Sequence, residues 1–469
     1  MKPKTLLALT CVAVLMGGFI VFFEKDLPST DERRELDTKV LDLKADQVEE
    51  IRLQQGEGLV VLVRDEPDRP EGEETVTAGP QEPKWRLLEP IATRADSAGV
   101  EDLLSRLVSL SKSRDLEGAD PAELGIGADS RTVSLSGPAG ERRLRLGTAV
   151  PLSTDLAVER EDGRLLQSPV GSELLALLDR SSAEWRDKRL FVGRRNAVET
   201  VTLHRADGVI RFRRSGEGER FRLVEPLTDH VDSDRLRGFL GTVTGLEADT
   251  FSRGRDEHGL NPPLGSIELG FGDAEPSWTL QIGRPPGADE DGLGDDRLWV
   301  AASTAVDEEE VAAILDTAVL DALQSPVDGW RSKKWTDFQV FSVDRATFEG
   351  PLLPQPVELQ RNSGEWHRGD EVIEYTLASD ALYPMTEIRA VALLDRDQAA
   401  GRFQLDAPRL QVTLGNDSRE DVLSLYSVAG NEVAATLDGR EAVLLLPADE
   451  IDAWISKILA LIDASPVSE

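Results

Sequence analysis

The chain carries one dense acidic run, GADEDGLGDD at residues 287–296, that invites a cation site. Hard cations such as Ca²⁺ take clustered oxygen ligands. The EF-hand spacing fails, however, because Leu293 and Val300 stand where a ligand oxygen and the bidentate glutamate belong. We therefore predict a solvated hairpin loop here and keep a weak cation site as the alternative.

The histidines are the next candidates for acid–base or metal chemistry. His204 lies in an alternating, strand-like stretch and His258 in the polar loop DEHGL, but the spacing gives neither a Ser or Cys partner. No phosphate-binding loop, dinucleotide fingerprint, GxSxG elbow or HExxH motif occurs. Carboxylates are too numerous to single out a glycosidase pair. We predict no catalytic, cofactor-binding or metal-binding residue, no cofactor, and a protein that is not an enzyme.

Large aromatic residues recur at one position, occupied by Trp85, Phe221 and Trp366. A repeated apolar residue on one strand is what a repeated core needs, so we predict core residues and keep a sugar-stacking platform as the alternative. WRDK at Trp185–Lys188 and WRSK at Trp330–Lys333 are interpreted as junctions. There the tryptophan would pack between modules and the basic residues would cap a helix end, with partner binding as the alternative.

Composition excludes several classes of protein. The chain has 469 residues, 53 Lys+Arg against 87 Asp+Glu, and a formal net charge of −34. Such a surface would be repelled by a phosphate backbone, so we expect no nucleic-acid partner. At 40% hydrophobic the chain is too apolar to be wholly disordered. Its single cysteine excludes an internal disulfide framework.

Self-comparison reveals a repeated unit. KWRLLEP, which contains Trp85, returns as RFRLVEP 136 residues later, whereas VEEIRL upstream of it returns as VETVTL 150 residues later. The first copy therefore holds an insertion of 14 residues, which the change in spacing places within residues 66–82. In a third, diverged copy, VELQRNSGEWH aligns with VIRFRRSGEGERF, and Leu405 aligns with Leu124 and Leu260.

Within a copy, strand-like and helix-like periods alternate in a fixed order. Hairpin signals surround Gly56–Gly58 and Pro138–Gly140, and Asp96 can cap a helix whose leucines follow at helical spacing. Asp162-Gly163 and Asp438-Gly439 are favoured two-residue hairpin pairs. A second helix is predicted in each copy, at Gly171–Asp179, Glu308–Leu323 and Ala448–Ile462. Each copy is thus predicted to be an α+β module, an antiparallel sheet with two helices.

The amino terminus reads as a membrane anchor. Thr5–Phe23 is 19 residues without a charge, and as a helix it would span ~28 Å of the bilayer. We predict an uncleaved transmembrane signal anchor, with a cleaved signal peptide and lipidation at Cys11 as alternatives. Because Lys and Arg lie on both sides of the apolar run, the positive-inside rule does not settle its orientation in the membrane. A basic start before an apolar run is, however, typical of secretory signals. We therefore expect residues 24–469 to lie outside the cytoplasm.

These features together resemble the family catalogued as domain of unknown function 4340. The resemblance covers most of residues 40–340 and rests on the amino-terminal membrane helix, the basic W-R-D-K stretch, W-x-L-x-x-P at Trp85–Pro90, D-x-x-x-V-x-x-L-L-x-x-L at Asp96–Leu107, Leu124-Gly125, and L-x-L-G at Leu144–Gly147. It implies a membrane-tethered extracytoplasmic protein, often encoded beside ABC transporters of the gliding-motility type. It implies no catalytic or binding residue.

The expected organisation follows from these observations. It is a cytoplasmic tail (1–4), a transmembrane anchor (5–23), a linker (24–38) and three α+β modules (39–190, 191–335 and 336–469). We expect a single-pass protein of the cytoplasmic (inner) membrane, with its bulk periplasmic or extracytoplasmic. Its expected role is that of a non-enzymatic accessory or scaffold protein, with ABC transporter subunits as partners. The alternative is a module that binds an envelope glycan or a cation in a cleft between modules.

Overall fold

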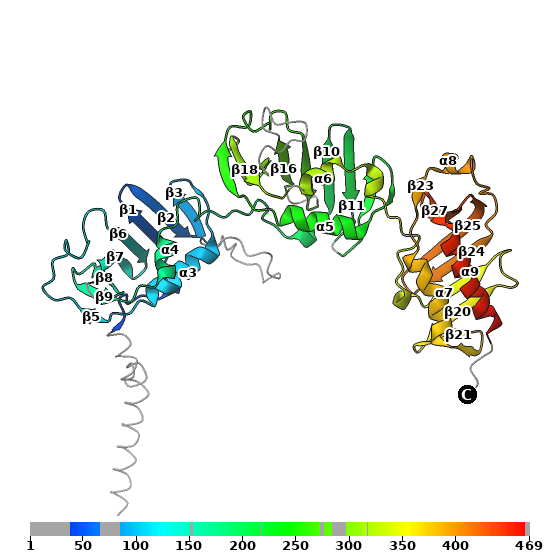
Figure 1. Cartoon of the computed structure of the whole chain (residues 1–469), viewed down its shortest axis with the longest axis horizontal. Helices are drawn as coiled ribbons and strands as arrows, with labels where there is room; N and C mark the ends of the chain where they lie inside the picture. Colours follow the sequence, from blue (N-terminus) through cyan, green and yellow to red (C-terminus); the bar gives the residue numbers. More distant parts are fainter. Residues whose placement is uncertain are drawn as a thin grey trace, which may run out of the picture. The chain divides into compact units, whose positions relative to one another are not determined.

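The structure, a computed structural model, describes residues 38–65, 85–150, 153–216, 218–272, 276–283, 297–316 and 318–464 (Figure 1). In these ranges it contains three nine-stranded antiparallel sheets and seven α-helices, which confirms the α+β class. The expected tail (1–4), anchor (5–23) and insertion (66–82), and all but residue 38 of the linker (24–38), lie outside the described residues. No described helix is both long and apolar enough to cross a bilayer.

The chain divides into two compact units, one ending at Arg189 and the other beginning at Leu190. The first unit contains the first sheet, and the second unit contains the second and third sheets. We call each sheet with its helices a module. The limits of the three expected modules, 39–190, 191–335 and 336–469, stay a prediction, and each of these ranges holds one sheet.

The first module begins with a short 3-10 helix, and its α-helices lie together along one side of the sheet (Figure 1). Its elements are η2 (Ala45–Gln47), β1 (Glu50–Gln55), β2 (Gly58–Arg64), β3 (Trp85–Glu89), β4 (Thr93–Arg94), α3 (Ser97–Val108), β5 (Arg114–Asp115), β6 (Arg131–Gly137), β7 (Gly140–Ala149), β8 (Leu156–Arg160), β9 (Leu165–Ser168) and α4 (Ser172–Leu178).

The second module repeats this order and ends in a further 3-10 helix. Its elements are η3 (Arg195–Ala197), β10 (Thr200–Arg205), β11 (Gly208–Arg213), β12 (Arg222–Glu225), β13 (Asp229–His230), α5 (Ser233–Thr244), β14 (Thr250–Arg253), β15 (Gly265–Gly270), β16 (Trp278–Gly283), β17 (Leu298–Ala302), β18 (Glu310–Ile314), α6 (Ala318–Gln324) and η4 (Val327–Gly329).

The third module adds a short helix, α8, to the two that we predicted. Its elements are η5 (Val340–Ser342), β19 (Arg345–Glu349), β20 (Val357–Asn362), β21 (Glu365–Arg368), β22 (Glu371–Ile373), α7 (Tyr375–Glu387), β23 (Ala392–Leu394), α8 (Arg396–Ala400), β24 (Leu410–Gly415), β25 (Glu420–Ala429), β26 (Glu432–Leu437), β27 (Val443–Pro447) and α9 (Ala448–Asp463).

The three sheets have one topology. Their strand orders are β4-β3-β2-β1-β6-β7-β8-β9-β5, β13-β12-β11-β10-β15-β16-β17-β18-β14 and β22-β21-β20-β19-β24-β25-β26-β27-β23. In each, the first strand lies between its hairpin partner and the second strand after the first long α-helix, and the strand that directly follows that helix lies at the edge of the sheet. Nine strands in an identical order confirm that the sequence repeats are copies of one fold, including the diverged third copy.

Both faces of each sheet are covered. In β27, Leu444 belongs to the large core that faces the helices, whereas Val443 and Leu445 belong to a small cluster with Phe403. Because successive residues of a strand point to opposite faces, the small cluster lies on the other face of the sheet. The first and second modules have the same arrangement, with small clusters around Leu124 and Leu260.

The repeated glycines of the L-x-L-G and L-Q-I-G strands serve these small clusters. A Cβ on Gly147 would collide with the backbone carbonyl of Leu124, and a Cβ on Gly283 with that of His258 and the side chain of Leu260. Each glycine thus lets a loop lie directly against its strand, which explains why the sequence repeats it.

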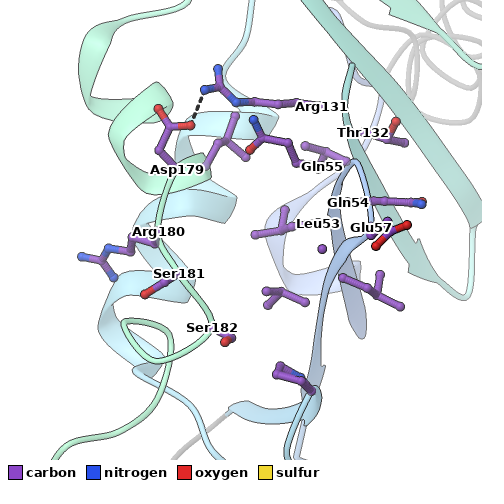
Figure 2. A pocket seen from close by; sticks show the side chains of 16 residues that line it. Leu53, Gln54, Gln55, Glu57, Arg131, Thr132, Asp179, Arg180, Ser181 and Ser182 are labelled. Carbon is purple, nitrogen blue, oxygen red and sulfur yellow. Dashed lines mark hydrogen bonds and ion pairs between the residues drawn. The ribbon is translucent and has the colours of Figure 1, made fainter. Parts of the chain in front are cut away.

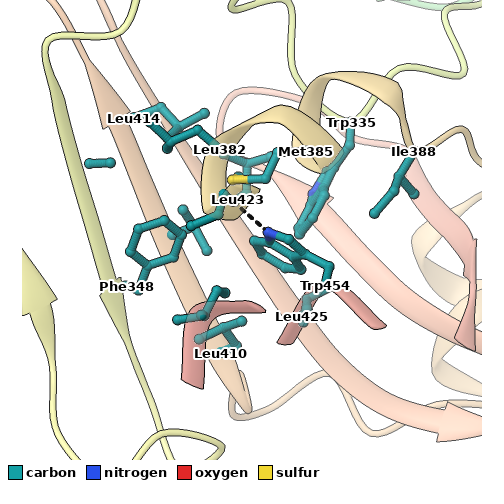
Figure 3. Packing of buried hydrophobic residues seen from close by; sticks show 14 of the residues in the cluster. Trp335, Phe348, Leu382, Met385, Ile388, Leu410, Leu414, Leu423, Leu425 and Trp454 are labelled. Atoms are coloured by element: carbon teal, nitrogen blue, oxygen red, sulfur yellow. Dashed lines mark hydrogen bonds between the residues drawn. The ribbon is translucent and has the colours of Figure 1, made fainter. Parts of the chain in front are cut away.

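The large cores contain the repeated aromatic residues. Trp85 and Trp366 are buried, as predicted, whereas Phe221 is only partly buried. In the third module Trp335 and Trp454 meet edge to face, with ring centroids 5.3 Å apart (Figure 3). The indole nitrogen of Trp454 donates a hydrogen bond of 2.7 Å to the Ala381 carbonyl, which ties α9 to α7.

The predicted helix caps are present. The Asp96 side chain accepts a hydrogen bond from the Gly99 backbone at 3.1 Å, and Asp232 accepts from Asp234 and Arg235. These carboxylates satisfy amide groups that a helix leaves without a partner in its first turn. The repeated aspartate therefore sets the beginning of the first α-helix in two modules.

Two predictions about local structure are wrong. Within the predicted helix 308–323, Glu310–Ile314 is the strand β18, and only α6 is helical. All five residues of β18 are buried, because both sheet faces are covered, so the alternation that marks a strand is missing. The predicted two-residue turns at Asp162-Gly163 and Asp438-Gly439 are both longer. β8 ends at Arg160 and β9 begins at Leu165, and β26 ends at Leu437 and β27 begins at Val443.

The interpretation of the junction tryptophans is also wrong. Trp185 and Trp330 do not pack between modules: each is buried in the core of the module that it ends. Their carbonyls accept hydrogen bonds from the backbone nitrogens of the helix caps Asp96 and Asp232, at 2.8 and 2.9 Å. The tryptophan thus closes its own module, because it packs beside the helix that this module's cap begins.

A candidate ligand-binding cleft in the second unit

A cleft of about 480 Å³ opens in the second unit, where the second module meets the segment that leads into the third. Its walls come from η3, the ends of the β11–β12 hairpin, the first two turns of α5, and the segment after Trp330. The lining residues are Arg195, Asn196, Arg214, Gly218, Glu219, Arg220, Phe221, Ser233, Asp234, Leu236, Arg237, Leu240, Lys334, Asp337 and Gln339.

The cleft is positively charged in a strongly acidic chain. Among the described residues that line it, five are Arg or Lys and three are Asp or Glu, a surplus of two positive charges. The whole chain has a net charge of −34. A concave site of the opposite sign to the rest of the surface concentrates anions.

The basic side chains are held in different ways. Arg214 donates from Nε to the Val198 carbonyl at 2.7 Å, and its guanidinium lies over the Phe221 ring at 4.8 Å from the centroid. Arg237 pairs with Asp234 at 3.0 Å, but both side chains are about 70% exposed (73% and 68%). The side chain of Arg195 makes no hydrogen bond or ion pair with any described residue, so its guanidinium is available to a ligand.

Asp337 is the one carboxylate of the cleft with a strongly shifted pKa. Arg220 lies 2.9 Å and His230 3.5 Å from its Oδ2 atom. Burial opposes ionisation, but the hydrogen bond from His230 and the charge of Arg220 outweigh it and lower the pKa of Asp337 from 3.8 to about 2. Asp337 therefore stays charged at neutral pH and fixes Arg220 in place.

The stacked arginine and aromatic residue, with the side chains around them, form what we call the corner of a module. The first module builds this corner differently. Arg64 lies opposite Trp85 on paired strands, with its guanidinium 4.6 Å from the ring centroid, as Arg214 lies over Phe221. There Glu101 accepts a hydrogen bond of 2.9 Å from the Trp85 indole and lies 3.4 Å from Arg64. The stacked arginine of the first module is therefore neutralised by a carboxylate.

The third module also neutralises its stacked arginine. Arg361 lies opposite Trp366 on paired strands, 5.8 Å from the ring centroid, and donates to the Asp344 carboxylate at 2.7 Å. Among the described residues, Arg214 of the second module has no carboxylate partner. Of the three equivalent corners, the second alone joins an unneutralised stacked arginine to further basic residues.

A second pocket, of about 470 Å³, lies in the first unit beside the β1–β2 hairpin and the end of α4 (Figure 2). Its two arginines, Arg131 and Arg180, are balanced by Glu57 and Asp179. Arg131 pairs with Asp179, as Figure 2 shows, and Arg180 reaches Asp96 at 3.0 Å. With both cations occupied, this pocket offers no surplus charge to a ligand.

A buried ionic network lies near the cleft. Arg440, in the turn between β26 and β27, donates to both Asp229 carboxylate oxygens, at 2.6 and 3.2 Å, and Arg331 donates to Asp229 at 2.6 Å. Arg440 also donates to the Ser332 carbonyl at 2.7 Å. Burial opposes ionisation of Asp229, but the hydrogen bonds and charges of the two arginines outweigh it and lower the pKa of Asp229. The network joins β13 of the second module to the third.

The residues singled out in the sequence do not converge on a reactive site. His204 lies on β10, 3.4 Å from Glu268, and His258 stacks on Trp299 while its Nε2 lies 3.2 Å from Ser252. The acidic run 287–296 lies outside the described residues, and within the described ranges no three His, Cys, Asp or Glu side chains are grouped for a metal.

Sequence reasoning missed the cleft, although a signal was present. Arg64 and Arg214 repeat at the spacing of 150 that relates VEEIRL to VETVTL, and each lies over the repeated aromatic. Arg195 and Arg237 break the repeat, since the first residue of η2 is Ala45 and the fifth of α3 is Glu101. These two departures from the repeat, at Arg195 and Arg237, are the sequence signal that indicates the cleft.

Comparison with known proteins supports a family resemblance and gives no activity. The sequence matches no curated protein and no solved structure. The matched stretch of the family model begins at the first residue of β3 and ends two residues before β15, so it takes in parts of two modules. The resemblance predicted from the motifs around Trp85 and Asp96 is thereby confirmed: residues 85–263 match the family described as "Domain of unknown function (DUF4340)".

Proposed function

We propose that this chain is a membrane-tethered, extracytoplasmic accessory protein that scaffolds a membrane complex and is not an enzyme. The observation that carries the proposal is the construction of one nine-stranded module three times, with its aromatic residues used to fill cores. Repeated modules provide extended surfaces made by neighbour contacts. The tether is the apolar run Thr5–Phe23, and the expected location is the cytoplasmic membrane with the bulk periplasmic.

The buried network of Asp229, Arg331 and Arg440 supports a scaffold role. A bidentate arginine–carboxylate contact fixes orientation as well as distance. Because this contact runs from the second module to the third, it restrains how the two present their surfaces. Such restraint is what a protein needs if several partners are to meet on it.

The expected partner is an ABC-type transporter, because the resemblance to the DUF4340 family implies that genomic setting. The test is purification of the full chain from its own membranes in mild detergent. Transporter subunits should co-purify. A chain with a cleavable secretory signal in place of residues 5–23 is the control, and should recover much less. Failure to recover transporter subunits in several detergents would contradict the proposed partner.

The location can be tested by single-cysteine labelling, because Cys11 is the chain's only cysteine. Asp162 lies in an exposed turn of the first module, so Asp162→Cys adds a thiol without disturbing the core. A membrane-impermeant maleimide should label this variant in cells whose inner membrane is intact. Labelling that appears only after the inner membrane is broken would place the modules in the cytoplasm and refute the proposal.

A further inference from the structure

We propose that the cleft of the second unit binds a small organic anion, one that carries a carboxylate or phosphate group on a sugar-sized body. This site is separate from the scaffold role. The cleft volume of about 480 Å³ lies within the range of small-molecule sites, roughly 300–1,000 Å³.

Arg195 and Arg237 are the anion-binding side chains. Arg195 lies alongside α5, since a Cβ on Gly241 would be 3.5 Å from its Nη1 atom, and Gly241 is one turn beyond Arg237. The Arg195 guanidinium has no hydrogen-bond or ion-pair partner among the described residues, and the Arg237 pair with Asp234 is highly exposed. Exposed pairs contribute little to stability, so a ligand can take Arg237 from Asp234 at little cost.

The apolar residues that line the cleft indicate what kind of molecule carries the anionic group. Phe221, Leu236 and Leu240 line it beside the arginines, and one face of the Phe221 ring is covered by Arg214. An apolar surface in the same cleft as two guanidinium groups suits a molecule with a charged end and a flat or apolar face. The same surplus of positive charge disfavours the cation expected as one alternative from the sequence.

Comparison with the first module supports the assignment. Ala45 and Glu101 occupy the places of Arg195 and Arg237, and Trp85 donates to Glu101. The equivalent corner therefore lacks one arginine and fills the place of the other with a carboxylate. The anion site belongs to the second unit and is not a general property of the fold.

The test is isothermal titration calorimetry with the full chain in mild detergent at fixed ionic strength. The probes are glucuronate, glucose 6-phosphate, citrate and inorganic phosphate, with neutral glucose as the uncharged control. At least one organic anion should bind with 1:1 stoichiometry and at least ten-fold more tightly than glucose. Arg195→Glu and Arg237→Glu should each weaken that binding at least ten-fold.

The matched control is Arg164→Glu, because Arg164 is 70% exposed in a turn of the first module and the substitution makes the same change of charge. It should alter binding less than two-fold. An equal loss in Arg164→Glu, binding of glucose as tight as that of the anions, or binding of none of the four anions would each overturn the proposal. Since all three substituted side chains are exposed, unchanged melting temperatures will separate lost binding from lost folding.

Discussion

The first and second modules place the same arginine over the same aromatic slot and then diverge. Around Arg64 the first module adds Glu101, which closes the corner with an ion pair and an indole hydrogen bond. Around Arg214 the second module adds Arg195 and Arg237, which leave the corner open and positive. Two side-chain exchanges thus separate a closed structural corner from a candidate binding site on one fold.

A second difference lies at the end of the sheet. The second module has Asp229 at the first residue of β13, where the first module has Thr93 at the first residue of β4. Asp229 meets two buried arginines, one of them from the third module. The network of β13 therefore reaches the neighbouring module, whereas Arg94 of β4 lies 3.8 Å from the buried Asp187 of its own module.

Removing Asp229 should have the largest effect on stability. Asp229→Ala leaves Arg440 buried without a carboxylate and leaves Arg331 only the exposed Asp328, and such a loss costs about 3–5 kcal/mol. Hydrogen–deuterium exchange of the full chain should show faster exchange in peptides covering β13 and the β26–β27 turn, with the first unit unchanged.

The matched control is Thr93→Ala, which removes a side chain from the equivalent position of β4 and should cost less than ~1 kcal/mol. Equal effects of Asp229→Ala and Thr93→Ala would show that the network does not stabilise the second unit.

Truncation of the repeated aromatic residue should have the next largest effect on stability, and the effect should differ between the first and second modules. Trp85 is fully buried, so Trp85→Ala should destabilise the first unit by about 4 kcal/mol. Phe221 is partly buried, and Phe221→Ala should cost the second unit only about 2 kcal/mol. Urea unfolding followed by exchange mass spectrometry gives both values on the full chain. A larger loss of stability from Phe221→Ala than from Trp85→Ala would contradict the smaller contribution that we assign to the partly buried Phe221.

Acid should weaken the second unit before the first. The pKa of Asp337 is lowered to about 2 in the folded chain, so its contribution is complete above the unfolded value of 3.8 and is lost as the pH falls through 2. The shift corresponds to about 2 kcal/mol, and the lowered pKa of Asp229 acts in the same direction. Exchange between pH 5 and pH 2 should therefore rise first in the second unit, and Asp337→Asn should reduce that dependence.

The repeated fold could be predicted from the sequence because one pattern recurs with its spacing. Asp96 predicted a helix start, which Asp232 repeats in the second module, and VELQRNSGEWH predicted a third copy, in which it forms the β20–β21 hairpin. Strand β18 could not be recognised by alternation, because the small cluster around Leu260 buries its second face. Comparison with β9 of the first module would have corrected that error.

The cleft was less predictable than the fold. Lys334 and Asp337 reach it from the segment after Trp330, more than 100 residues beyond Phe221, and nothing in the spacing brings these residues together. Trp330 was misplaced for a related reason. A tryptophan at the end of a copy can pack forward or backward, and only the structure, which buries Trp330 beside Phe212 and Phe239, assigns it to the second module.

The smallest expected effect is the most direct test of the corner itself. Glu101→Gln removes the ion pair with Arg64 but keeps an oxygen that can accept from the Trp85 indole, so the first unit should lose less than ~1 kcal/mol. Arg237→Gln in the second unit breaks only the exposed pair with Asp234 and should be neutral within ~0.5 kcal/mol. Urea unfolding of the two variants measures the difference. If Arg237→Gln were the more damaging, Arg237 would be serving stability as Glu101 does, and the contrast between a closed corner and an open cleft would be lost.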